Sequence, residues 1–144
     1  MSVVRLDVAP DAAHVRVVRL VAVSLARLNG VDEEVVEDVR LAVGEACGRA
    51  VAAHVRAEVD TPVVVDFEGQ SGLTVTVSDT VALPRATGPE AVALLAGAGA
   101  PVADEDYFEA APEVIALLEG LADTVTVNTG RAGTAVSLHW SAGG

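Results

Sequence analysis

The chain has 144 residues, which is the length of one domain with a single hydrophobic core. Hydrophobic residues make up 51% of it and charged residues 21%, so the composition excludes intrinsic disorder. The 21 acidic residues against 9 basic ones give a formal net charge of −12. Because phosphate backbones repel such a chain, we expect no direct binding to nucleic acid.

Cysteine content and apolar runs predict the compartment. The single cysteine, Cys47, cannot form an internal disulfide, which favours a reducing environment. The stretch that begins at Met1 has no signal-type apolar region, and the longer apolar runs are interrupted by Arg, Asp or Glu. We therefore expect a soluble cytoplasmic protein that does not enter a membrane.

The first third of the chain is predicted as one strand and two helices. Residues 3–8 mix apolar and polar positions like a half-buried strand. Apolar residues recur at helical spacing in 11–28, and Asn29-Gly30 follows as a stop signal. A second helix is expected from 32 to about 56, with an apolar stripe at three- and four-residue spacing.

The rest of the chain is predicted as two hairpins separated by a Gly- and Pro-rich segment. The β-branched runs that form the hairpins are 61–68 with 73–79, and 123–129 with 134–140. Residues 83–112 are expected to be mobile, with a short helix at 89–95, and 112–121 as a further helix. This order predicts a single α+β domain over 1–144, a two-layer sandwich whose mostly antiparallel sheet is covered on one face by helices.

The histidines and the single cysteine of the chain form no recognisable metal-binding or nucleophile motif. His14, His54 and His139 lie far apart in the sequence and have no short-range ligand partner, so we expect no metal site. His14 and His54 are predicted as ordinary surface or boundary residues. Cys47 falls on the apolar stripe of the second helix, where a buried inert thiol is expected.

Four segments resemble a known family, in the family's own order. Residues 39–51 are similar to the N-box helix of the GHKL superfamily of histidine-kinase and Hsp90-like ATPase domains, and within it to the serine kinases of the RsbW and SpoIIAB type that act as anti-sigma factors. Residues 75–79 resemble the strand that ends in the adenine-reading Asp. Residues 117–127 and 133–136 resemble the last helix, strand and hairpin of the family. The resemblance therefore implies a GHKL, or Bergerat-like, fold with 83–112 in the place of the ATP lid.

The resemblance also implies roles for individual residues. Glu45 stands where the family places its catalytic base, and Asp79 where it places the residue that reads adenine. The family's magnesium-binding Asn is replaced by Arg49. Thr134 is retained in the closing hairpin, although β-propensity explains a Thr there equally well.

Several departures from the family pattern predict a degenerate ATP site. A guanidinium has fixed positive charge and cannot bind a metal ion, and the i, i+4 spacing instead favours an ion pair between Glu45 and Arg49. The residues after Asp79, at 80–83, include none of the glycines that let backbone approach a nucleotide. Residues 112–114 stand where a second glycine motif would fall, and Glu113 adds negative charge.

These observations leave three hypotheses of function. The first is an anti-sigma-factor-like regulator that binds a sigma factor or a STAS-domain anti-anti-sigma protein in a partner switch, and that needs no cofactor. The second is an active ATP-dependent serine kinase of a STAS-domain protein, with Mg²⁺ and ATP bound, Glu45 as base and Arg49 on a phosphate. The third is a fold relative with an unrelated binding role. Homodimer formation is left open.

The segment in the place of the lid contains a candidate partner-binding site. Tyr107 and Phe108 are two of the few aromatic residues of the chain and lie within the acidic cluster 104–109. The functional interpretation is that they anchor a partner while the acidic residues attract its basic surface. The alternative is that they anchor the loop to the domain's own core.

Overall fold

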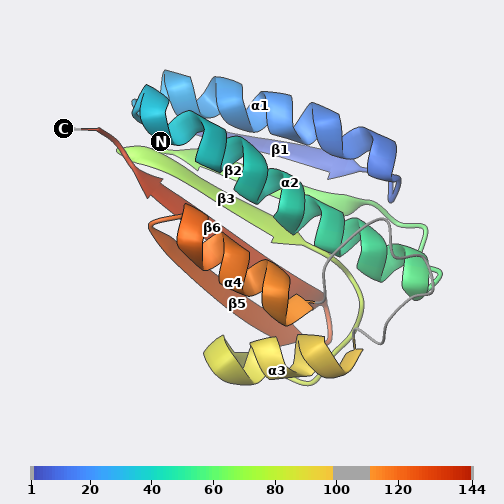
Figure 1. Cartoon of the computed structure of the whole chain (residues 1–144). Coiled ribbons are helices and arrows are strands. Elements are labelled where there is room, and N and C mark those ends of the chain that lie inside the picture. The colour runs from blue at the N-terminus through green and yellow to red at the C-terminus, as the bar shows by residue number, and fades with distance from the viewer. Residues whose placement is uncertain (1, 99–110, 144) are drawn as a thin grey trace.

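One six-stranded antiparallel sheet forms the framework of the domain. The structure is a computed structural model and describes residues 2–98 and 111–143. The strand order across the sheet is β1-β2-β3-β6-β5-β4 (Figure 1). The strands are β1 (Ser2–Val8), β2 (Val63–Gly69), β3 (Gly72–Ser78), β4 (Ala86–Thr87), β5 (Thr124–Gly130) and β6 (Gly133–Ser141).

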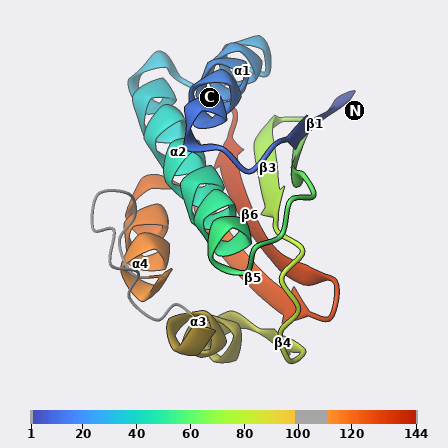
Figure 2. The same cartoon turned by 90° about the vertical axis from the view of Figure 1, so that its right-hand side faces the viewer.

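The helices cover one face of this sheet. They are α1 (Val15–Leu28), preceded by the 3-10 turn Ala12–His14, then α2 (Glu33–Arg56), α3 (Gly88–Ala98) and α4 (Ala111–Leu121). Helix α1 packs against β2 and β3, α2 reaches across to β6, and α4 lies over β5. Figure 2 shows these three helices on one side of the sheet, with α3 beyond them near β4.

The core lies between the helices and the sheet, and it is built mainly of Val, Ala and Leu. Alternate residues of β6 point inward, and Trp140 is the largest fully buried side chain. Its Nε1 donates to the carbonyl oxygen of Leu121, 2.9 Å away, and so joins β6 to the end of α4. A chain with so few aromatic residues thus fills its core by alternation along strands and by small residues along α2.

The predicted fold class is confirmed: the protein is α+β, with an antiparallel sheet and one helical layer. The two predicted hairpins form, as β2–β3 and β5–β6. Within the predicted mobile segment, the described residues 86–98 form β4 and α3, which is longer than the short helix expected there.

Candidate functional site

Asp79 follows β3 directly and is held by the start of β6. Its backbone N–H donates to the carbonyl oxygen of Thr134 at 3.0 Å, and the N–H of Thr134 donates to Asp79 Oδ1 at 3.3 Å. Gly133 makes this approach feasible, because its φ is +124° and a Cβ there would overlap the carbonyl oxygen of Asp79. The carboxylate is thereby fixed at the point where β3 and β6 begin to part.

The carboxylate of Asp79 forms a buried ion pair with Arg49 of α2. Arg49 Nη2 donates to Asp79 Oδ2 at 2.5 Å, and only 5% and 1% of the two side chains are exposed. The other carboxylate oxygen, Oδ1, also accepts from the N–H of Val81 at 2.9 Å. Both oxygens of Asp79 are therefore engaged within the protein.

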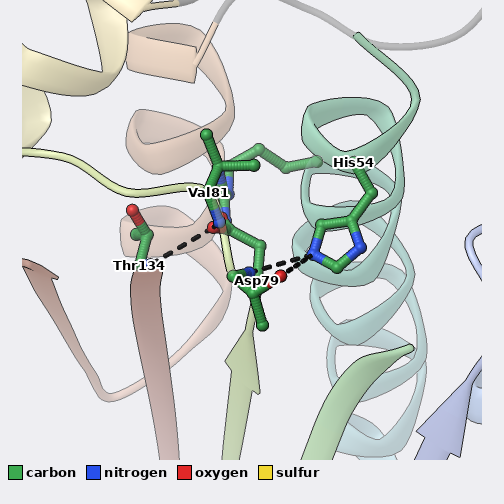
Figure 3. Close-up of polar contacts among 6 residues, drawn as sticks. His54, Asp79, Val81 and Thr134 are labelled. Carbon is green, nitrogen blue, oxygen red and sulfur yellow. Dashed lines mark hydrogen bonds and ion pairs between the residues drawn. The ribbon is translucent and has the colours of Figure 1, made fainter. Parts of the chain in front are cut away.

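The loop after Asp79 is tied to the C-terminal end of α2. The side chain of His54 is fully buried, and its Nε2 accepts from the N–H of Thr80 at 2.9 Å. Its Nδ1 lies 2.9 Å from the carbonyl oxygen of Thr61, so Nδ1 carries the proton and donates. Figure 3 shows His54, Asp79, Val81 and Thr134 gathered in this region. The loop after Asp79 is therefore fixed by side chains.

The expected ion pair between Glu45 and Arg49 is wrong. Arg49 turns inward to Asp79, and Glu45 stays half-buried on α2 without a hydrogen bond or ion pair to any described side chain. The physical reason is burial. An unpaired guanidinium in the core is costly, so Arg49 pairs with the buried carboxylate of Asp79 and not with the partly exposed carboxylate of Glu45.

Two polar atoms beside Asp79 are buried without a partner among the described residues. They are Arg49 Nε and Thr134 Oγ1. An unsatisfied buried donor or acceptor costs about 1–3 kcal/mol. The polar groups around the ion pair are therefore not all satisfied, and the contact between Arg49 and Asp79 is what compensates the two buried charges.

The other predicted site residues lie elsewhere or outside the described ranges. Residues 112–114 belong to the first turn of α4, so this stretch is helical and is not a loop. Tyr107 and Phe108 lie outside the described residues. A cavity of about 550 Å³ lies between α3, α4 and β5, and none of Glu45, Arg49, Asp79 or Thr134 lines it.

Within the described ranges, Cys47 and the other acidic and histidine side chains form no metal-binding cluster. The side chain of Cys47 is fully buried on α2, and burial raises its pKa to about 11. Over residues 2–98 and 111–143, no group of three or more His, Cys, Asp or Glu side chains is arranged to hold a metal ion. In the same ranges no helix has the length and apolar character needed to cross a bilayer.

Sequence reasoning missed two features of this site. His54 is not a surface or boundary residue but a fully buried link between α2 and the loop after β3. Arg49 was expected to have a partner on its own helix, whereas its partner is 30 positions further along the chain. One signal in the sequence could have indicated this partner. Arg49 lies among small apolar residues, which predicts that its side chain is buried, and a buried guanidinium requires a buried carboxylate to pair with it.

Comparisons with known proteins agree with this fold. Residues 8–140 match the model of the histidine kinase-like ATPase domain. The chain belongs to this family. A search of curated proteins found no match.

Among solved structures, the chain is similar to the RsbU and RsbW domains of Rv1364c from Mycobacterium tuberculosis, with a TM-score of 0.65 and 17% identity. The similarity covers 98% of this chain but 32% of that one, so the chain spans about a third of the length of this relative. Likeness at this level of identity supports the shared fold.

Proposed function

We propose that this protein is an RsbW-like regulator that acts by binding a protein partner and does not depend on nucleotide. The observation that carries the proposal is the buried ion pair between Arg49 and Asp79. It engages the carboxylate that the family uses to read adenine, and it does so with the residue that replaces the family's magnesium ligand. A regulator that keeps the fold and loses the nucleotide site can still present the surfaces of the fold to a partner.

The residues present do not fit a complex of ATP with Mg²⁺. Arg49 cannot bind a metal ion, since a guanidinium has no lone pair to offer at any accessible pH. Asp79 would have to leave Arg49, and that would strand a charge in the interior. In the adjoining loop Thr80 and Val81 already donate their N–H groups to His54 and Asp79, so these groups are not free to bind phosphate.

The charge of the chain supports a basic protein partner. A net charge of −12 favours encounter with a positively charged surface and disfavours encounter with nucleic acid. Sigma factors and STAS-domain anti-anti-sigma proteins are the partner classes that an RsbW-like role implies. Tyr107 and Phe108 are proposed as partner anchors on the basis of the sequence alone.

The test is capture of partners with the tagged protein, in parallel samples with Mg²⁺ and ATP, with ADP, and with EDTA. We expect a sigma factor or a STAS-domain protein to be recovered equally in all three. Purified partner then gives the same Kd within about threefold in each buffer, a difference of less than about 1 kcal/mol. A partner that binds only with ATP contradicts the proposal, and recovery of an unrelated partner class supports a fold relative with another binding role.

One observation favours a second candidate function, an ATP-dependent serine kinase. Glu45 is half-buried and makes no hydrogen bond or ion pair with another described side chain, so it is free to accept a proton as a catalytic base. The assay measures phosphate transfer from ATP to a recovered STAS-domain partner, detected by mass spectrometry. If transfer occurs and Glu45→Ala abolishes it while the circular dichroism spectrum is unchanged, this second function replaces the first.

A further inference from the structure

Strand β5 has an unpaired stretch on its outer edge. The short strand β4 pairs with β5 only at Asn128 and Thr129. The chain then leaves the sheet at Gly88, whose φ is +60°, and begins α3. Among the described residues, no strand lies beside 124–127 on that side. Strand β5 therefore continues beyond the end of its neighbour.

The backbone of this stretch turns hydrogen-bonding groups toward the open edge. Thr134, which pairs with Thr129, exchanges hydrogen bonds with Asp79 on the far side of β6, so its N–H and C=O point away from β5. In an antiparallel pair of this kind the opposite residue also points its groups outward, so those of Thr129 face β4. By the period of two, Val127 and Val125 point theirs toward the same edge, where no described strand pairs with them.

The cavity between α3, α4 and β5 opens onto this edge. Its lining includes the consecutive residues 125–128 of β5, whereas a cavity over one face of a strand is lined by alternate residues. The cavity therefore lies beside the strand, along its backbone. Its volume of about 550 Å³ is within the roughly 300–1,000 Å³ of ligand-binding sites. Figure 1 shows α4 over β5 and α3 at this end of the sheet.

The walls of the cavity are apolar in the middle and acidic at one end. Val92 of α3 and Ile115 of α4 contribute apolar side chains from the two helices. Glu119 lies one helical turn after Ile115, is exposed, and is the only charged residue among the described residues that line the cavity. Because α4 ends at Leu121 and β5 begins at Thr124, Glu119 lies near the beginning of β5, away from β4.

We propose that this cavity binds an extended segment of another protein that adds a strand to β5 and carries a basic residue for Glu119. The segment continues the line of β4 beyond Thr87, antiparallel to β5, and its backbone pairs with the groups that β5 leaves free. An apolar side chain of the segment lies between Val92 and Ile115, and a Lys or Arg two residues further lies beside Glu119.

The alternation of the strand also fixes which backbone groups of the segment pair with β5. Ala86 of β4 is buried on the helical side, and its partner Thr129 turns its backbone groups toward it. In the continued strand, the residues whose side chains face the helices are therefore those whose N–H and C=O face β5. This inference goes beyond the proposed function and does not depend on it, because the buried ion pair does not line the cavity.

The probe is the peptide acetyl-Thr-Val-Thr-Arg-Thr-amide, titrated into the isotope-labelled full chain and followed by amide NMR. We expect saturable shifts at Val125 and Val127 with a Kd on the order of 100 µM, since a short free peptide loses conformational entropy on binding. Methylation of the backbone nitrogen of its Val removes a donor to β5 and should raise the Kd at least ~10-fold. Methylation at the central Thr, whose N–H points away from β5, should change it less than about threefold.

A charge exchange tests the role of Glu119. Glu119→Lys should raise the Kd of the Arg peptide at least ~10-fold and should favour acetyl-Thr-Val-Thr-Glu-Thr-amide instead. Glu68→Lys is the matched control, because it makes the same change in net charge at an exposed position of β2. It should leave the order of the two peptides unchanged. Circular dichroism melts confirm that each variant is folded before its binding is interpreted.

Three results overturn the proposal. The first is the absence of saturable shifts up to about 2 mM peptide, well above the expected Kd, or shifts confined to other elements. The second is equal weakening by the two methylated peptides, because the peptide then does not pair with β5 as a strand. The third is an equal response of Glu119→Lys and Glu68→Lys, because the basic residue then lies elsewhere.

Discussion

Arg49 and Asp79 come from α2 and from the end of β3, and they meet in the interior with Nη2 and Oδ2 2.5 Å apart. They are 30 positions apart in the sequence and face each other in the fold. The pair binds the helical layer to the centre of the sheet. Both side chains are buried, so the pair is part of the core.

The first prediction concerns the coupling between these two side chains. Asp79→Asn keeps an oxygen for the N–H groups of Val81 and Thr134 but leaves Arg49 as an uncompensated buried charge, so we expect a loss of about 3–5 kcal/mol in the free energy of unfolding. Arg49→Met should cost a similar amount. The double variant should be clearly more stable than the sum of the single effects predicts. Urea unfolding measures all three, and additive losses would refute the coupling.

The second prediction compares two glycines. Gly133→Ala should lower the free energy of unfolding by at least about 2 kcal/mol, because Gly133 has φ +124° and its Cβ would overlap the backbone of Asp79. Gly120→Ala in α4 is the matched control: a Cβ there meets nothing within 4 Å, and alanine favours the helix, so it should stabilise by roughly 0.5–1 kcal/mol. Thermal unfolding distinguishes them, and equal effects would contradict the close approach of β6 to Asp79.

The third prediction concerns the buried histidine. His54→Ala removes the acceptor for the N–H of Thr80 and the donor to the carbonyl oxygen of Thr61, and it leaves a cavity. We expect a loss of about 2–4 kcal/mol in the free energy of unfolding. Nitrogen NMR of the native protein near pH 7.5 should show the tautomer protonated at Nδ1. A signal from the tautomer protonated at Nε2 would contradict the hydrogen bonds assigned to His54.

The fourth prediction follows from the pKa of Cys47, which burial raises to about 11 in the folded protein. Between about pH 9 and 11 the unfolded chain loses this proton and the folded chain keeps it. The folded state therefore binds more protons in this window, and the contribution of Cys47 to stability is lost as the pH rises. This dependence of the free energy of unfolding on pH should disappear in Cys47→Ala, and urea unfolding at several pH values measures it in both proteins. A slope that is the same in both proteins would exclude Cys47 as its source.

Regular spacing made most of the fold predictable. The apolar stripe of α2 and the β-branched runs of the two hairpins are local patterns, and the observed bounds differ from the predicted ones by a residue or two. Segment 83–112 was harder, because Gly and Pro suggest irregular backbone although α3 forms there through packing on α4 and β5. Helix α3 therefore depends on tertiary contacts, which local sequence patterns do not reveal.

The site was less predictable than the fold. The local rule for i, i+4 pairs assigned Glu45 to Arg49, but burial gave Arg49 a partner that only the folded chain brings near. His54 carried no motif, and its role depends on a loop that lies 26 positions away in sequence. Long-range polar contacts of this kind follow from the fold and cannot be derived from spacing along one helix.

Whether the protein acts without nucleotide is tested by a calorimetric titration of the full chain with ATP in the presence of Mg²⁺, with a matched titration in EDTA. Because the Arg49–Asp79 pair would have to break before adenine could bind, we expect no saturable heat below the millimolar range, where a Kd corresponds to only about −4 kcal/mol. A micromolar Kd that depends on magnesium would contradict it.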